Sequence, residues 1–223
     1  MSNALDASGS DQSAEVEKII EKVEQKDAVA VSCPKPKKEY IDMWLLNVGQ
    51  NIPLSDKSYI PENLELLNKD MANRDGICIE KSTKLAFEQM ALDAKKEKVF
   101  IKVTSGFRSY NTQNNILTEA KKTNIEADLF IAKPGYSEHQ LGTAMDISGK
   151  SISYGGASRA FDGTLESEWL KINAHKYGFV MSYPYEKESI TGYGYEPWHY
   201  RYLGPEIAFS IHENNLTITE YLE

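Results

Sequence analysis

Apolar residues recur at helical spacing between residues 81 and 96. Leu85, Met90, Ala91 and Ala94 fall on one side of this segment, while lysine and aspartate occupy other positions. This spacing is typical of a helix that buries one face and exposes the other. The sequence therefore predicts a helix over residues 81–96.

A second segment with this spacing, residues 165–177, directs Trp169, Leu170 and Ile172 inward and is followed by Gly178. Glycine suits the position after a helix because it adopts a left-handed backbone conformation without a steric cost. A helix that ends at this glycine is predicted.

Two more helices are indicated by the residues at their starts. Residues 110–122 follow a turn in which Ser109 or Asn111 is available to cap the first backbone N–H groups. Pro205 suits the first position of a helix, where its missing N–H is not needed, and so begins a predicted last helix.

Short stretches between these helices have the apolar or alternating character of strands: 99–104, 141–147, 179–183 and 198–203. Helices interspersed with short strands favour an α+β fold, here a small, mainly antiparallel sheet flanked by helices. Residues 33–75 are rich in proline, asparagine and aspartate and are predicted to form loops and short extended pieces. Trp44, Leu45 and Leu46 are expected to anchor this part to the core.

The N-terminal part differs from the rest. Residues 1–4 are interpreted as a cloning remnant, and an export signal is expected to have been trimmed; residues 5–12 are predicted to be a flexible linker. Apolar residues then recur at helical spacing within a charged segment, which predicts an amphipathic helix: Val16, Ile19, Ile20 and Val23.

This amphipathic helix has two interpretations. It can serve as a stalk or oligomerisation handle, or it can pack on the flank of the domain, which we favour. We therefore divide the chain into residues 1–33, holding the remnant, linker and helix, and residues 34–223, forming one domain.

Composition narrows the functional classes. The 223 residues carry a formal net charge of −8, which gives no reason to expect binding to nucleic acid or anionic lipid. No apolar run approaches the roughly 20 residues that span a bilayer. Cys33 and Cys78 form no metal-binding or redox motif, and the sequence leaves open whether they pair or stay free.

Two segments combine histidine with carboxylates: Ser137 to Asp146, which contains His139, and Glu196 to Tyr200, which contains His199. A catalytic zinc site needs three protein ligands and one open position. His139, Asp146 and His199 supply that number, and we expect the site to lie on the sheet.

Glu196 has a different expected role. A carboxylate beside such a site that is not itself a ligand can act as general acid and base in hydrolysis. Glu196 and His199 are three positions apart and would face opposite sides of a regular strand, so both reach one site only if the chain bends. Pro197 provides a reason for that bend.

A third segment, Ser105 to Gln113, lies at a predicted strand end before a helix. Arg108 offers a planar guanidinium suited to a substrate carboxylate. Gln113 and Ser137 are expected to add polar contacts, and the stretch from Tyr193 to Tyr195 either lines the same pocket or packs on the surface.

Taken alone, Asp146 and Arg108 would be interpreted as a turn residue and a surface ion-pair partner. Their joint occurrence with the other residues favours a site. His175 and His212, each in a predicted helix without a companion motif, are expected to be structural.

The three segments SGFRSYNTQ, SEHQLGTAMD and EPWHY together resemble the zinc D-alanyl carboxypeptidases of bacterial cell walls, the family that includes vancomycin-resistance D,D-carboxypeptidases and L,D-carboxypeptidases. The similarity extends from about Ile60 to Gly204. It implies zinc bound by His139, Asp146 and His199, with Glu196 as catalytic acid and base.

The resemblance further implies that Arg108 contacts the substrate carboxylate and that the partner is a peptidoglycan stem peptide. It also implies an extracellular, wall-associated enzyme, from a Gram-positive bacterium, that releases terminal D-alanine. Whether it cuts a D,D or an L,D bond stays open.

Two alternatives remain. Two histidines and one carboxylate also form the metal site of non-haem Fe(II) oxygenases, although these have no use for Glu196 as a proton carrier. A wall-binding module that holds zinc without turnover would bind peptide but not cleave it.

Overall fold

The structure is a computed structural model that describes residues 4–27, 32–36, 48–49, 52–123 and 130–223. Its centre is a four-stranded antiparallel sheet in the order β3-β4-β6-β5. These strands are β3 (Ile101–Ser105), β4 (Ala144–Gly149), β5 (Phe179–Met181) and β6 (His199–Tyr202). A separate hairpin pairs β1 (Leu64–Leu66) with β2 (Cys78–Glu80).

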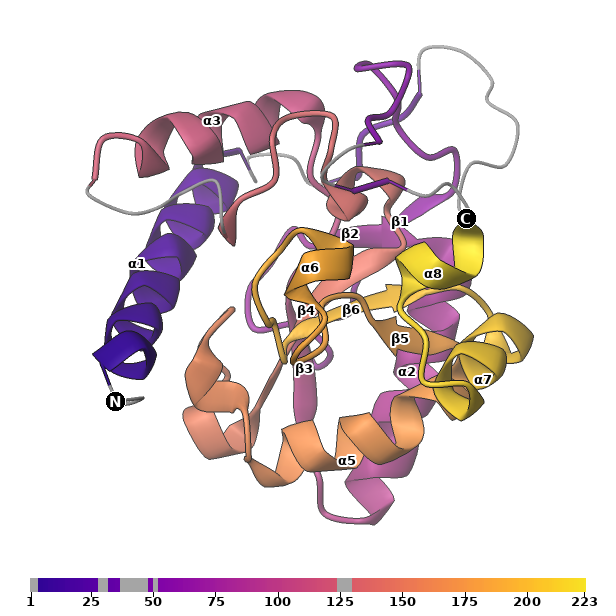
Figure 1. Ribbon diagram of the computed structural model, residues 1–223. Coiled ribbons are helices and arrows are strands. Elements are labelled where there is room, and N and C mark those ends of the chain that lie inside the picture. The colour runs from indigo at the N-terminus through magenta and orange to yellow at the C-terminus, as the bar shows by residue number, and fades with distance from the viewer. Residues whose placement is uncertain (1–3, 28–31, 37–47, 50–51, 124–129) are drawn as a thin grey trace.

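Helices surround this sheet (Figure 1). The α-helices are α1 (Ala4–Asp27), α2 (Lys81–Lys96), α3 (Tyr110–Ala120), α5 (Leu165–Asn173), α6 (Glu188–Thr191), α7 (Pro205–Glu213) and α8 (Ile218–Leu222). Short 3-10 turns are η1 (Glu138–Leu141), η2 (Lys150–Ile152), η3 (Arg159–Phe161) and η4 (Ala174–Tyr177). The predicted α+β class, with a small antiparallel sheet flanked by helices, is confirmed.

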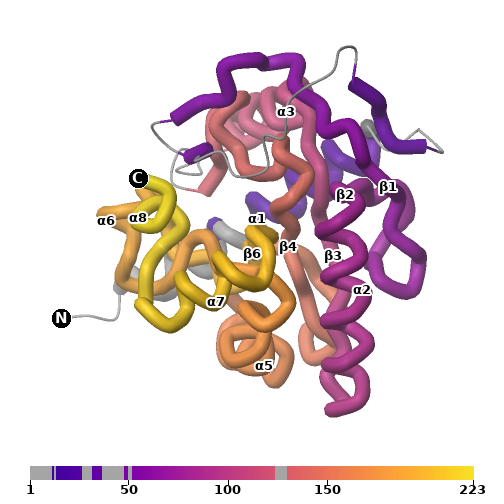
Figure 2. Tube along the Cα trace, turned by 90° about the vertical axis from the view of Figure 1, so that its right-hand side faces the viewer, coloured from indigo at the N-terminus to yellow at the C-terminus, as the bar shows by residue number. Residues whose placement is uncertain are grey.

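The two faces of the sheet have different environments. Met145, Ile147 and Tyr200 belong to the main core, together with buried residues of α2 and α5. Because successive side chains of a strand alternate between faces, Asp146 and His199 lie on the other face. Figure 2 shows α2 along one side of the molecule, α5 at its lower end and α3 at the top.

Several local predictions are confirmed, and some burial predictions are wrong. α2 and α5 form where the apolar spacing indicates, and α3 and α7 begin where the capping residues and Pro205 indicate; Ser109 caps α3 by accepting a hydrogen bond from Thr112 N. Leu85 and Ile172, however, are 56% and 62% exposed. Thr83 and Phe87 face the core in α2 instead, because the buried stripe is rotated from the one predicted.

Other elements were not predicted. Residues 5–12 belong to α1 rather than to a linker, and α8 follows α7, so the helix at Pro205 is not the last. The hairpin β1-β2 lies partly in the segment expected to form loops and short extended pieces. The predicted anchors Trp44, Leu45 and Leu46 lie outside the described residues.

Two features attach the N-terminal part to the domain. The predicted amphipathic stripe of α1 packs with Ile116, Leu117, Ala120 and Ile131. Cys33 forms a disulfide with Cys78 of β2, with a Cα–Cα distance of 5.8 Å. Cys33 and Cys78, whose pairing the sequence left open, are therefore paired. The helix α1 packs on the domain, as favoured, and its apolar stripe belongs to a buried cluster.

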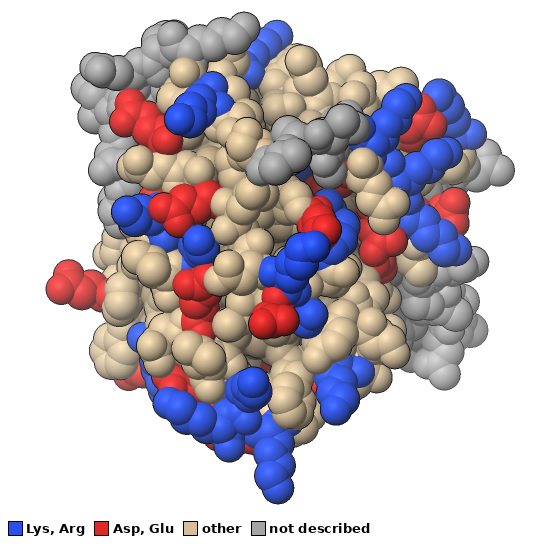
Figure 3. All heavy atoms as spheres, turned by 180° about the vertical axis from the view of Figure 1, so that it is seen from behind, with Lys and Arg blue, Asp and Glu red and all other residues tan. Residues whose placement is uncertain are grey.

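Charges of both signs are interspersed on the face seen from behind (Figure 3). Pairs such as Lys69 with Asp75 and Lys84 with Glu65 account for part of this mixture. Such a surface gives no concentrated field for a nucleic acid. Among the described residues, no helix is long and apolar enough to cross a membrane.

Candidate metal centre and active site

Strand pairing brings two of the predicted ligands together. Asp146 of β4 and His199 of β6 are direct partners in the antiparallel register, and Ser105 of β3 is the partner of Asp146 on the other side. Side chains of directly paired residues point to the same face of a sheet. The three residues consequently form a row across the strands, on the face opposite the main core.

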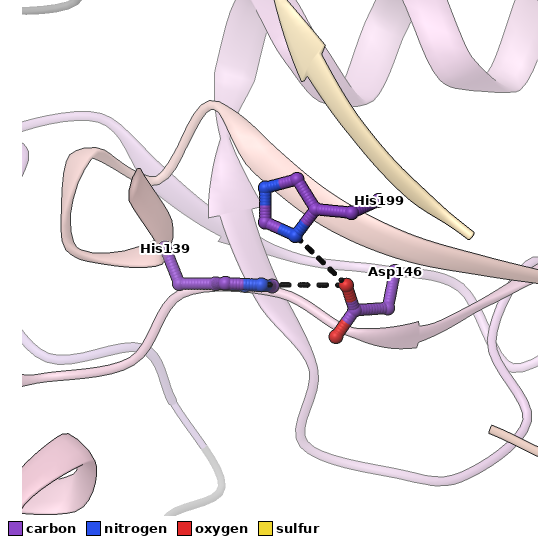
Figure 4. Close-up of side chains that lie close together, drawn as sticks. All are labelled: His139, Asp146 and His199. Carbon is purple, nitrogen blue, oxygen red and sulfur yellow. Dashed lines mark ion pairs between the residues drawn. The ribbon is translucent and has the colours of Figure 1, made fainter. Parts of the chain in front are cut away.

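His139 reaches this row from η1, directly before the turn to β4. The turn ends at Gly142, whose φ of 73° lies in the left-handed region that favours glycine. Figure 4 shows His139 and His199 directed toward Asp146 from different segments. Asp146 Oδ1 lies 3.4 Å from His139 Nε2 and 3.2 Å from His199 Nδ1.

Each imidazole is held through its other nitrogen. His139 Nδ1 lies 2.7 Å from the carbonyl oxygen of Gly106, which can only accept, so this nitrogen carries the hydrogen. His199 Nε2 lies 3.0 Å from Glu138 Oε2. Both rings are thereby oriented with the remaining nitrogen toward Asp146, the arrangement by which outer partners commonly fix metal-binding histidines.

The three side chains fit a divalent metal ion. One ligand atom from each lies within 4.8 Å of the others, and all three residues are buried. Zinc bonds of about 2.1 Å at tetrahedral angles separate neighbouring ligand atoms by roughly 3.4 Å. The distances to Asp146 Oδ1 match that value, and His139 Nε2 and Asp146 Oδ1 are buried without a hydrogen-bond partner.

Electrostatics makes the two histidines different. Burial disfavours charge on both and lowers the pKa of His139 to about 4, with the Arg108 guanidinium as the next cause. For His199 burial is outweighed by the adjacent carboxylates of Asp146 and Glu138, which raise its pKa to about 10. At neutral pH the metal-free site holds a proton on His199, between two carboxylates.

Glu138 is a site residue that the sequence interpretation missed. Its carboxylate accepts hydrogen bonds from Ser182 Oγ at 2.6 Å and Arg201 Nη1 at 2.9 Å, besides its contact with His199. Burial alone would raise its pKa, but Arg201 and His199 outweigh burial and lower the pKa to about 2. Arg201 could have pointed to Glu138 in the sequence. It shares a strand face with His199, and a buried arginine there needs an acidic partner.

Glu196 lies beside the cluster, as predicted. Its Oε2 is 3.6 Å from His199 Nδ1, and the chain between the two residues bends, with His199 N donating to the carbonyl oxygen of Glu196. Burial raises the pKa of Glu196 to about 8, against the lowering effect of His199. A carboxylate in this position can exchange a proton with a neighbouring group.

Arg108 lies on the other side of Asp146. Its Nη2 is 3.2 Å from Asp146 Oδ2, and its Nη1 donates to Gln113 Oε1 at 3.1 Å. Gln113 Nε2 in turn donates to the carbonyl oxygen of Ala132 at 2.8 Å. Gln113 therefore fixes the guanidinium while it also lines the cavity.

One cavity collects all the residues predicted for the site: Arg108, Gln113, Ser137, His139, Asp146, Glu196 and His199. Tyr193 lines it too, whereas Tyr195 donates to Asp162 and lines a different hollow. His175 and His212 stack on each other at 3.7 Å between ring centroids, away from this cavity, and their structural interpretation stays a prediction.

The fold and the cluster define a small α+β domain built around a buried site of two histidines and one aspartate. A family model described as VanY, D-alanyl-D-alanine carboxypeptidase, matches residues 76–205. The chain belongs to this family, and the resemblance read from its motifs is confirmed.

Individual relatives agree with this assignment. YodJ of Bacillus subtilis (strain 168) is 40% identical over 171 residues, which cover 74% of this chain and 62% of that protein. A D-alanyl-D-alanine carboxypeptidase of Enterococcus faecalis is 33% identical and is also covered to 62%. The chain thus spans about six tenths of the length of these curated relatives.

Among solved structures, the LD-carboxypeptidase LdcB has a TM-score of 0.72 and 38% identity, covering 78% of this chain and 83% of that chain.

Proposed function

We propose that the protein is a zinc carboxypeptidase that releases terminal D-alanine from peptidoglycan stem peptides. The observation that carries the proposal is the cluster of His139, Asp146 and His199, with unpartnered atoms at distances suited to zinc. Family membership supports a carboxypeptidase rather than an oxygenase with the same ligand types. A further solved relative, a point mutant of the vancomycin resistance D,D-pentapeptidase VanY from a VanB-type cassette, is in complex with Zn(II); it has a TM-score of 0.67 and 31% identity, and the match covers 81% of this chain and 99% of that chain.

In this proposal His139 Nε2, Asp146 Oδ1 and His199 Nδ1 hold the ion. Zinc, when bound, supplies Lewis acidity that polarises a carbonyl group and makes water more acidic. The protein's own task is to keep the two imidazoles in the required tautomers, which the Gly106 carbonyl and Glu138 accomplish.

Glu196 carries protons in the proposed reaction. Its carboxylate accepts a proton from the attacking water and later donates one to the leaving amine of D-alanine. The position of Glu196 beside His199, and its burial in the cavity wall, support this role.

Arg108 binds the terminal carboxylate of the peptide in this account, because a guanidinium can donate two parallel hydrogen bonds to a carboxylate. Gln113 orients Arg108, and Ser137 offers a hydroxyl group in the cavity wall. The substrate class places the work of the enzyme at the cell wall, outside the cell.

The bond that is cut is left as D,D or L,D, since LdcB is an LD-carboxypeptidase and VanY a D,D-pentapeptidase by name. Mass spectrometry of tetrapeptide and pentapeptide muropeptides after incubation with zinc-loaded protein tests the proposal. Loss of one alanine from either substrate is expected and identifies the bond. No loss from either one at full zinc occupancy would reject the proposal and favour a binding module.

The metal assignment has its own test. His139→Ala is expected to lose zinc, whereas Glu196→Gln is expected to keep it, since Glu196 is not a ligand in this account. Metal analysis of the two purified variants distinguishes them. Iron in the purified protein, with oxygen consumption, would instead favour the oxygenase alternative.

A further inference from the structure

Helix α1 lies against the catalytic cavity. Val16 and Ile20 line that cavity, and Glu24, one further turn along, reaches Arg108. Residues spaced four apart share one stripe of a helix. α1 therefore presents two apolar side chains and one carboxylate to the proposed active site.

Glu24 occupies a carboxylate-binding position. Its Oε1 lies 3.2 Å from Arg108 Nε and accepts a hydrogen bond from Ser105 Oγ at 2.6 Å. Its Oε2 pairs with Arg74. Glu24 is buried, and two guanidinium groups and a hydroxyl group surround its carboxylate, as expected for a bound substrate carboxylate.

Little space remains in the cavity with α1 in place. The cavity volume is about 40 Å³, whereas sites for small molecules typically have about 300–1,000 Å³. A volume of this size holds only a few water molecules. A peptide end cannot enter beside Val16 and Ile20.

Two further contacts fix the position of α1. Ile19 and Val23 pack against α3 on one side. On another side the carboxylate of Glu17 lies directly against Gly156 and accepts a hydrogen bond from its backbone. The helix is thus fitted to the domain on both sides of the cavity.

We propose that α1 is an autoinhibitory segment: Glu24 takes the place of the substrate's terminal carboxylate at Arg108, and the peptide enters only when α1 leaves the cavity. This inference rests on the proposed function, because it takes Arg108 as the carboxylate-binding group.

Two features make α1 displaceable and able to return. Burial raises the pKa of Glu24, and Arg108 and Arg74 offset this only in part, so the buried charge weakens docking. The disulfide from Cys33 to Cys78 ties the chain shortly after α1 beside the segment that carries Arg108. A tethered segment returns at high effective concentration.

Steady-state kinetics of the zinc-loaded full chain on muropeptides tests the proposal. Val23→Asp, which places a charge against α3, and Glu24→Ala, which removes the carboxylate, should each raise kcat/KM by about tenfold or more, since the competent fraction increases. Gln25→Asp and Glu15→Ala change exposed positions of the same helix and should leave kcat/KM within about twofold. Unchanged kcat/KM in both Val23→Asp and Glu24→Ala would overturn the proposal.

A second measurement is independent of turnover. Phenylglyoxal labels accessible arginines, and Arg108 is 6% exposed with α1 docked. Mass spectrometry should find faster labelling of Arg108 in Val23→Asp than in Gln25→Asp, in metal-free protein. Equal rates would overturn autoinhibition. If every zinc-loaded variant is inactive but the labelling rates differ, the proposed function fails while the covering role of α1 stands.

Discussion

Two buried glutamates, Glu138 and Glu24, have similar partners but opposite pKa shifts. Glu138 accepts hydrogen bonds from Arg201 and Ser182 and contacts His199, and its pKa is lowered to about 2. Its partners therefore outweigh the cost of burial.

Glu24 also has two arginines, Arg74 and Arg108, and one serine, Ser105, as partners, yet burial keeps its pKa above the usual range. Arg108 divides its interactions between Glu24 and Asp146. The comparison therefore distinguishes Glu138, a structural carboxylate that orients His199, from Glu24, which in our proposal occupies the binding position of the substrate carboxylate.

Removing Glu138 should have the largest effect on stability. Glu138→Ala removes the carboxylate that pairs with Nη1 of the fully buried Arg201, and breaking such a buried pair costs about 3–5 kcal/mol in the free energy of unfolding. Urea unfolding of metal-free protein measures this loss. Glu168→Ala, which breaks an exposed pair with Lys171, is the control. An equally small loss of unfolding free energy in both variants would contradict the structural role of Glu138.

Zinc binding should expel the proton that Glu138 and Asp146 hold on His199. Because the pKa of His199 is raised to about 10, the metal-free site is protonated at pH 7, and zinc must displace at least one proton. Zinc affinity should then rise with pH over the range in which His199 is protonated in the metal-free protein. Calorimetric titration in buffers of different ionisation enthalpy counts the protons; zero released at pH 7 would contradict the assignment.

Removing Glu24 should cost little stability, in contrast to Glu138. In Glu24→Ala, Arg108 keeps Asp146 and Gln113 as partners, and water can reach Arg74. The free energy of unfolding should fall by less than in Glu138→Ala, because burial offsets part of what Glu24 gains from Arg108 and Arg74. A loss of about 3 kcal/mol or more in urea unfolding would mean that Glu24 is a structural carboxylate too.

Removing the disulfide between Cys33 and Cys78 should have the smallest of the expected effects, a modest change in the labelling rate of Arg108. The double variant Cys33→Ser, Cys78→Ser lowers the effective concentration of α1 at the cavity, so Arg108 should be labelled a few times faster by phenylglyoxal. Wild-type protein treated with reductant should match the variant. A slower rate in either sample would contradict the tether's role in returning α1.

Much of the fold was predictable because local patterns determine it. The helix over residues 81–96 follows from apolar spacing, and so does the helical segment 165–177, which consists of α5 and the 3-10 turn η4 and ends at Gly178. The exposure of Leu85 and Ile172 could not be predicted. Apolar spacing leaves the rotation of a helix about its axis uncertain by about one residue, and contacts with the sheet determine it.

The grouping of the candidate site residues in one cavity was also largely predictable, since three motif segments carry them. Pairing of Asp146 with His199 across β4 and β6 required the strand register, which the sequence does not give. Glu24 was one acidic residue among several in a charged helix. Its meeting with Arg108 depends on contacts between distant segments, and no local pattern indicates it.

The most direct test of the account is the release of D-alanine by zinc-loaded wild-type protein and by Glu196→Gln, with zinc content measured in the same samples. Both proteins should contain one zinc ion, and the variant should lose about 100-fold to 10,000-fold in turnover, the range for a general acid and base. Equal turnover with equal zinc would contradict the role of Glu196 and with it the proposed reaction.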